Sequence, residues 1–260
     1  MCRNNYKVVR LWRYFKDFIL SYYYPNGKYF IISFPNSGRS WLIYMIKCIL
    51  NEIKNNDLQI ENSHDFSEII IEDGTRQNPN LLFKFIKRYK YLRANVIFLC
   101  RDPRDVISSN YYQVTNRAKN PFIFKDKSEF ITHEVFGFKR VIHFYNLWFR
   151  NKSIPKKFLL IKYENLLGGL DELKKTLIFL NIDAPDTLIE KIYNQSNAEL
   201  MRKKEINKSI DEISNFGNSI NKLKVRKAIK GSYLNELSQE DIKYCNKEML
   251  NLNKYFNYKI

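Results

Sequence analysis

Short apolar segments separated by helical patterns organise this chain. Three segments, at residues 29–34, 95–100 and 158–163, are almost continuously apolar, as strands buried on both faces of a parallel sheet are. The stretches between them place apolar residues three and four positions apart, which is typical of amphipathic helices. Strands that alternate with helices predict βαβ units, and therefore an α/β fold in which a central parallel sheet lies between helical layers.

The helical patterns lie between and after these strands. We expect helices at 41–51, 81–92, 104–116, 134–150, 171–180, 183–194 and 238–253. A further short strand is expected to end just before His64, and Ser238 carries the pattern of a helix cap. No internal repeat or low-complexity linker divides the chain, so we predict one domain over 1–260. A helical extension is expected at 1–27, a mobile loop at 207–224, and a mostly helical C-terminal part.

The charge of the chain favours anionic ligands. There are 44 Lys and Arg residues against 27 Asp and Glu, a net charge of +17, and such a positive field attracts phosphates and sulfates. The alternative interpretation is that most of this surplus reflects the general composition of a chain rich in Lys, Asn, Ile and Tyr. Residues 81–93 combine basic and aromatic side chains, but their helical spacing fits an amphipathic surface helix. We therefore do not expect a nucleic-acid partner.

No segment of the sequence has the length and apolarity of a transmembrane helix, because no apolar run approaches the roughly 18 residues that a span needs. Residues 8–24 are basic and aromatic, and a helix packed on the domain is favoured over contact with a membrane surface. The N-terminal residues contain no uninterrupted apolar stretch of the kind found in a signal peptide, so we do not expect one. The four cysteines form no close pair, which favours a reducing compartment. We expect a cytoplasmic location.

The first chemical motif is the loop that follows the strand at 29–34 and reads Pro-Asn-Ser-Gly-Arg-Ser-Trp over 35–41. A tight glycine-containing loop that opens a helix gathers backbone N–H groups and the positive end of the helix dipole, which together bind phosphate or sulfate. Ser37, Arg39 and Ser40 add donors, and Ser40 is expected to cap the helix. The lysine that ends a Walker A loop is absent, so ATP is not favoured.

The second motif follows the strand at 95–100. This strand delivers Arg101 to its carboxyl end, and Ser109 lies eight residues further on in the next helix. Both side chains can therefore reach one anion, Arg101 by a forked contact and Ser109 by its hydroxyl. A salt bridge from Arg101 to a neighbouring aspartate is the alternative interpretation.

Two later segments add weaker signals. The third strand ends at Tyr163, whose ring can face a base or a substrate, or can simply pack at the strand end. Near the C-terminus, Arg226 and Lys227 with the nearby Gly231 form a basic turn. Such a turn can close over a phosphate, although taken alone it is typical of a solvated surface patch.

Taken together, the order and spacing of these motifs resemble those of the sulfotransferases that use 3′-phosphoadenosine 5′-phosphosulfate (PAPS), and most closely small bacterial-type members with a type-1 sulfotransferase domain. The resemblance covers about residues 29–249. It implies a P-loop-like three-layer α/β/α fold and PAPS as the sulfuryl donor. It also implies 3′-phosphoadenosine 5′-phosphate (PAP) as a product, no metal, and a small-molecule or saccharide acceptor.

The resemblance also implies roles for the motif residues. The loop holds the 5′-phosphosulfate and its tryptophan stacks near the adenine, while the arginine and serine of the second motif bind the 3′-phosphate under the basic turn. The donor-binding residues of the family correspond here to Pro35, Asn36, Ser37, Gly38, Arg39, Ser40, Trp41, Arg101, Ser109, Tyr163, Arg226, Lys227 and Gly231.

The resemblance further implies a histidine base between the first two motifs, and His64 corresponds to it. Two positions depart from the family pattern. The family usually has a lysine directly after the loop proline, where it contacts the bridging oxygen, and this chain has the uncharged Asn36. Arg39, three residues away, is a candidate for the missing charge, so we list His64, Asn36 and Arg39 as catalytic residues. Ala228 stands where the basic turn of the family has glycine.

Three alternatives to a PAPS-dependent sulfotransferase stay open at this point. A PAPS- or PAP-binding protein with weak or no turnover follows if Asn36 cannot stabilise the leaving group. A nucleotide or sugar kinase of related fold is disfavoured by the absent Walker lysine. A nucleic-acid binder is supported only by the net charge and by the basic and aromatic run at 81–93. By analogy with the family alone, the acceptor is expected near 134–150 and 207–224.

Overall fold

The computed structural model describes residues 27–55, 57–64, 91–117, 121–207, 223–225 and 228–260. Several sequence predictions lie outside these residues. They concern the N-terminal extension, nearly all of the helix at 81–92, most of the loop at 207–224, and both Arg226 and Lys227.

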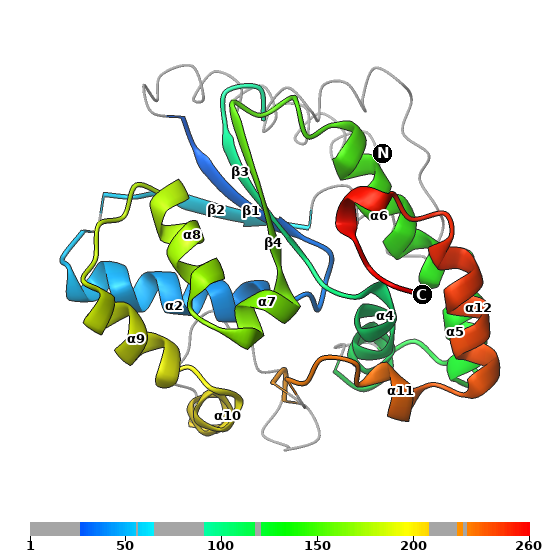
Figure 1. Ribbon diagram of the computed structural model, residues 1–260. Coiled ribbons are helices and arrows are strands. Elements are labelled where there is room, and N and C mark those ends of the chain that lie inside the picture. Colours follow the sequence, from blue (N-terminus) through cyan, green and yellow to red (C-terminus); the bar gives the residue numbers. More distant parts are fainter. Residues whose placement is uncertain (1–26, 56, 65–90, 118–120, 208–222, 226–227) are drawn as a thin grey trace, which may run out of the picture.

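A four-stranded parallel sheet forms the centre of the fold (Figure 1). Its strands lie side by side in the order β2-β1-β3-β4, and Ile31 of the second pairs in register with Ile97 of the third. The bounds are β1 (Tyr29–Ser33), β2 (Ile60–Ser63), β3 (Asn95–Cys100) and β4 (Lys157–Lys162). The predicted α/β fold with a central parallel sheet is confirmed.

Helices connect the strands and follow the last of them. They are α2 (Arg39–Glu52), α4 (Pro103–Tyr112), the π-helical turn η1 (Gln113–Arg117), α5 (Lys127–Thr132), α6 (Phe138–Arg150), α7 (Tyr163–Gly168), α8 (Asp171–Phe179), α9 (Asp186–Asn194), α10 (Ala198–Ile206), α11 (Tyr233–Glu236), α12 (Gln239–Met249) and the 3-10 turn η3 (Lys254–Phe256). Within the described part of the chain, none of them is long and apolar enough to cross a membrane.

The helices cover both faces of the sheet (Figure 1), and the alternation of side chains along β1 explains the two layers. Phe30 and Ile32 pack in a core with α4, α6 and α12, whereas Tyr29 and Ile31 pack in a second core with α2, α8 and α9. All four side chains are at most 5% exposed. Burying each contributes about 1.5–3 kcal/mol to folding, which holds the central strand between the layers.

Helix starts at α2 and α6 differ from the sequence predictions. The sequence predicts Ser40 as the cap of α2, but Gly38 holds that position with a φ of +94°, a left-handed conformation that glycine adopts at little cost. α6 begins at Phe138 rather than at residue 134, since the backbone at Gly137 is extended. The predicted cap at Ser238 is confirmed, because its side chain forms a reciprocal capping box with Asp241.

The carboxyl ends of the four strands meet at one edge of the sheet, and a predicted motif follows each strand there. The loop at 35–38 follows β1, His64 follows β2, Arg101 follows β3 and Tyr163 follows β4. In open parallel sheets the ligand-binding crevice lies outside these ends. The fold therefore brings together residues that are up to 128 positions apart in the sequence.

Candidate active site

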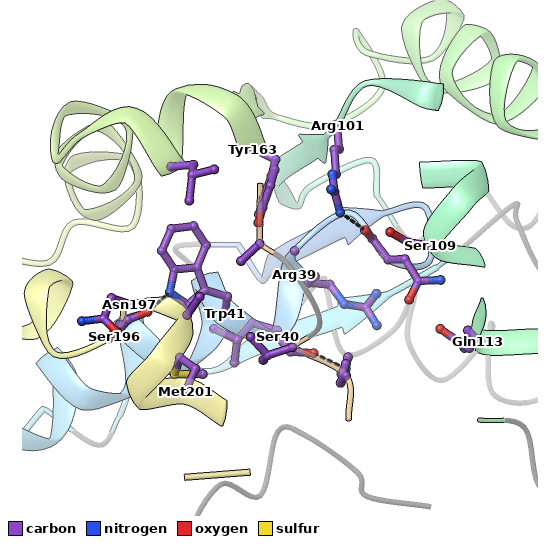
Figure 2. A pocket seen from close by; sticks show the side chains of 18 of the residues that line it. Arg39, Ser40, Trp41, Arg101, Ser109, Gln113, Tyr163, Ser196, Asn197 and Met201 are labelled. Carbon is purple, nitrogen blue, oxygen red and sulfur yellow. Dashed lines mark hydrogen bonds between the residues drawn. The ribbon is translucent and has the colours of Figure 1, made fainter. Parts of the chain in front are cut away.

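A cavity of about 970 Å³ lies at this edge of the sheet. In Figure 2, Arg39 and Ser40 lie between a polar side with Arg101 and Ser109 and an opposite side with Trp41. Pro35, Ser37 and Gly231 do not line the cavity. The predicted site residues that line it are Asn36, Gly38, Arg39, Ser40, Trp41, His64, Arg101, Ser109 and Tyr163.

The loop between β1 and α2 holds two residues in left-handed backbone conformations. Asn36 has a φ of +65°, which asparagine tolerates better than most residues, and its Nδ2 donates a hydrogen bond to Oδ1 of Asn110 at 3.3 Å. A Cβ added at Gly38 would lie only 2.5 Å from Cδ2 of Tyr163. The ring of Tyr163 therefore packs directly on the loop backbone, and glycine is required at this contact.

Arg101 is 8% exposed and is held from several directions. Its guanidinium lies 4.7 Å from the centre of the Tyr163 ring, and its Nη1 donates to the backbone oxygen of Asn36 at 3.4 Å. The Tyr145 hydroxyl donates to the backbone oxygen of Arg101 at 2.7 Å and accepts from its N–H at 3.0 Å. These contacts fix the arginine at the wall of the cavity.

Asp105 joins Arg101 to the segment near the C-terminus. This fully buried carboxylate lies 3.7 Å from Nη2 of Arg101, so the aspartate contact that the sequence left as an alternative exists beside the cavity. Asp105 also accepts from the backbone N–H groups of Gly231 at 2.8 Å and Tyr233 at 2.9 Å. Gly231 thus anchors the end of the basic turn. Ala228 has a φ of +51°, a conformation that favours the glycine of the family.

One face of α4 and η1 presents a polar stripe to the cavity. Ser109, Gln113 and Arg117 all line it. The sequence argument found only Ser109, although a spacing of four residues places the other two on the same helical face. Arg117 is 3% exposed, and burial lowers the pKa of its guanidinium. The stripe extends the polar side of the cavity beyond the predicted Arg101 and Ser109 pair.

An aromatic wall lies opposite this stripe. The Trp41 ring meets Tyr163 edge to face at a centroid distance of 5.9 Å and tilts against Tyr193 at 6.2 Å. Nε1 of Trp41 donates to the backbone oxygen of Ser196 at 2.7 Å, which fixes the indole. All four residues line the cavity, so one side of it offers flat apolar faces suited to a nucleobase.

His64 is oriented at both ring nitrogens. Nδ1 donates to the backbone oxygen of Ser33 at 2.8 Å, and Nε2 accepts from Nη2 of Arg39 at 2.8 Å. Burial, followed by the Arg39 charge, lowers the pKa of His64 from 6.5 to about 3. The imidazole is therefore neutral at pH 7 and carries its lone pair on the nitrogen that faces the loop.

The lowered pKa of His64 predicts acid-sensitive stability. The folded state binds fewer protons than the unfolded chain between pH 6.5 and about pH 3, so the stabilisation is complete above pH 6.5 and is lost as the pH falls through this window. We expect the free energy of unfolding to fall by about 3 kcal/mol more in the wild type than in His64→Gln between pH 7 and pH 4. Urea titrations at both pH values measure it, and equal falls would contradict the assignment.

Five cations and no carboxylate occur among the described residues that line the cavity. The cations are Arg39, Lys47, Arg101, Arg117 and Lys224. Lys224 lies in the segment predicted as a mobile loop and was missed by the sequence argument. Burial, then Arg117 and Arg39, lowers its pKa to about 8. In the described ranges no three His, Cys, Asp or Glu side chains come together as metal ligands. The donor set is that of an anion site.

The helix expected near the acceptor contributes mainly to the core. Phe138 and Tyr145 of α6 are fully buried beneath the sheet, and Phe136 is 8% exposed. None of them lines the cavity. These three aromatic side chains therefore belong to the core rather than to the cavity wall.

Comparisons with known proteins place the chain in a family. A model of the sulfotransferase domain matches residues 26–252. The protein belongs to the sulfotransferase domain family, as the sequence motifs indicate.

The relatives are distant and are matched in part. Mouse sulfotransferase 2A1 is 31% identical over 35% of this chain and 37% of its own length. The 3-beta-hydroxysteroid sulfotransferase of Cavia porcellus is 25% identical over 67% of this chain, and the match spans 66% of that relative's length. Rat sulfotransferase 2A6 is 27% identical over 68% of this chain and 71% of its own length.

Solved structures share the fold. Mouse sulfotransferase SULT7A1 complexed with PAP superposes with a TM-score of 0.59 at 18% identity, covering 85% of this chain and 82% of that one. Retinol dehydratase in complex with androsterone and PAP superposes with a TM-score of 0.60 at 14% identity, covering 92% of this chain and 84% of that one. At such identities the likeness extends to the architecture, and the site has to be argued from its own residues.

Proposed function

We propose that this protein moves the sulfuryl group of PAPS to a hydroxyl or amine of a small molecule or saccharide. The observation that carries the proposal is that the loop at 35–41, His64, Arg101 and Tyr163 follow four different strands and meet around one cavity, whose described lining residues include no carboxylate. Family membership and the PAP bound in related structures support the donor, and the androsterone and retinol in related structures support a small-molecule acceptor.

The described residues fit a nucleotide phosphorylated at both ends. Trp41 and Tyr163 offer faces for the adenine, and the loop and the start of α2 offer N–H groups for the 5′-phosphosulfate. Arg101 and Ser109 are proposed to bind the 3′-phosphate. Nε of Arg101 is buried without a hydrogen-bond partner among the described residues, as expected of a donor that awaits an anion.

His64 is proposed as the base of the reaction. The acceptor oxygen or nitrogen forms its bond to sulfur while the bond from sulfur to the 5′-phosphate oxygen breaks, and the electron pair passes to that oxygen. Nε2 of His64 takes the proton of the acceptor. Ser33 keeps the proton of the imidazole on Nδ1, so Nε2 carries the lone pair.

Arg39 has a proposed role beside the base. It occupies Nε2 of His64 in this structure, so it has to leave that nitrogen before a proton can be taken. A phosphosulfate at the loop gives its guanidinium a stronger, charged partner. Donor binding therefore frees the base and brings a cation to the transferring group.

Donor binding is tested by thermal unfolding with different nucleotides. We expect PAP to stabilise the protein by ~2.7 kcal/mol at a hundredfold excess over its Kd, with little effect from ATP, ADP or AMP at the same concentration. The specificity follows from the clamp at the 3′-phosphate, which those nucleotides lack. Equal shifts with all four nucleotides, or none with PAP, would contradict the proposed donor.

A PAPS-binding protein with little turnover is the second candidate. It is favoured by Asn36 in place of the usual lysine and by the contact between Arg39 and His64. Transfer of labelled sulfate from PAPS, screened over phenols, alcohols, amines and oligosaccharides, separates the two. Transfer to any of them supports the enzyme, and PAP binding without transfer supports the binding protein.

A further inference from the structure

We infer that Lys224 supplies the positive charge at the departing phosphate oxygen, the charge that Asn36 cannot provide. The inference rests on the proposed function and adds a catalytic residue to it. Lys224 is 188 positions from Asn36 in the sequence, yet both line the same cavity.

The ammonium of Lys224 lies at the anion-binding end of the loop. Its Nζ donates to Oγ of Ser40 at 2.5 Å, and Ser40 lies in the first turn of α2. The N–H groups of a first helical turn have no partners within the helix and favour an anion. A phosphate held by these N–H groups would contact the Lys224 ammonium directly, because Ser40 belongs to the same first turn and already contacts Nζ of Lys224.

Two other loop residues stand near this position. Asn36 is uncharged and donates its amide to Asn110, and Arg39 can reach the loop anion only after it leaves Nε2 of His64. Lys224 instead contacts a neutral hydroxyl of the loop, which an incoming phosphate oxygen can replace or share. The charge of Lys224 also reaches the base, since it contributes to the lowered pKa of His64. Lys224 therefore lies near both the loop and the proton acceptor.

The backbone that carries Lys224 is fixed by α10. The carboxylate of Glu205 is 2% exposed and accepts from the N–H groups of Lys224 at 2.6 Å and Val225 at 3.0 Å. Nε of Arg202 donates to the backbone oxygen of Val225 at 3.1 Å. A charge held in place in this way stabilises a developing anion without reorganisation during the reaction.

The electrostatics around Lys224 favour an anionic partner. Arg39 from α2 and Arg117 from η1 repel its ammonium, while Glu205 from α10 offsets part of that repulsion. With a pKa of about 8, Lys224 is mostly protonated at pH 7. A phosphate between these cations removes the repulsion and strengthens the charged form.

The first test measures binding and needs no turnover. Calorimetric titration of Lys224→Met with PAP is expected to show affinity about tenfold weaker than wild type, a loss typical of one charge-assisted contact. Adenosine 3′-monophosphate, which lacks the 5′-phosphate, is expected to bind both proteins equally. Equal losses for the two nucleotides, or no loss for PAP, would overturn the placement of Lys224 at the 5′ end.

Two further variants control for the change in net charge and for loss of folding. Lys203→Met removes an exposed lysine of α10 that pairs with Glu199, so it changes the net charge equally and is expected to leave PAP affinity unchanged. Where Lys224→Met does not fold, Lys224→Gln replaces it, since its amide keeps a donor for Ser40 without the charge.

The second test is kinetic and uses an acceptor found in the screen. Lys224→Met is expected to lower kcat by about 10²–10³-fold. Placing a lysine back in the loop, in the double variant Asn36→Lys with Lys224→Met, is expected to restore kcat at least tenfold over the single variant. An unchanged kcat in Lys224→Met, or no recovery in the double variant, overturns the role. A wild type that binds PAP without transfer overturns the proposed enzyme instead, and the binding test then judges Lys224 alone.

Discussion

Replacing His64 with alanine is expected to lower sulfuryl transfer by ~10²–10⁴-fold while PAP binding stays within a few-fold of wild type. The loss follows from removing Nε2, whose lone pair is proposed to take the proton of the acceptor. The nucleotide contacts remain, because His64 is argued to meet the acceptor and the loop cation Arg39 rather than the phosphates. Labelled-sulfate transfer and calorimetry with PAP measure the two quantities on the same preparation.

The control for this prediction is another histidine of the chain. His143 is exposed on α6 and does not line the cavity, so His143→Ala is expected to transfer sulfate at the wild-type rate. Wild-type turnover in His64→Ala would remove His64 from the mechanism. Equal loss of transfer and of PAP binding would indicate a structural role.

Replacing Gly38 with alanine is expected to abolish measurable PAP binding and to lower the free energy of unfolding by about 2–4 kcal/mol. The new Cβ meets Cδ2 and Cε2 of Tyr163 at 2.5 and 2.8 Å, and the left-handed φ of +94° adds backbone strain. Moving the ring of Tyr163 also disturbs Arg101, whose guanidinium packs on it. Urea unfolding and PAP titration measure both effects.

Two matched variants separate the causes. Gly168→Ala adds a Cβ that meets no atom within 4 Å, so it is expected to leave PAP binding and stability close to wild type. Adding Tyr163→Ala to Gly38→Ala removes the ring clash and leaves the backbone strain, which recovers part of the stability. A Gly38→Ala protein that binds PAP like wild type would show that the loop is not the phosphate site.

The sequence best predicted the positions of the site residues that directly follow a strand. Apolar runs locate strands, and parallel strands bring their carboxyl ends together, so Arg101, His64 and Tyr163 are placed by topology alone. Ser109, eight residues after Arg101, also lines the cavity, and its role toward an anion stays a prediction. These predictions depend on local pattern and on one general rule of sheet geometry.

The residues that the sequence argument missed depend on tertiary contacts. Lys224 follows a polar stretch with no periodic pattern, and hydrogen bonds that its segment makes with Glu205 and Arg202 of α10 hold it beside Ser40. Aromatic spacing in α6 likewise cannot tell a pocket face from a core face, and Tyr145 faces the core. The site roles of Arg226 and Lys227 stay predictions, as do the single domain and the helical extension.

The cations clustered around the cavity affect the stability of the ligand-free protein. Arg39 and Arg117 both repel Lys224, and the described residues of the cavity wall include no carboxylate, so this repulsion lowers the stability of the ligand-free chain. A polyanionic nucleotide removes that penalty on binding and adds its own binding free energy to folding. Under the proposed function, the supply of the sulfate donor is therefore expected to set how long the protein resists proteolysis as well as how fast it turns over.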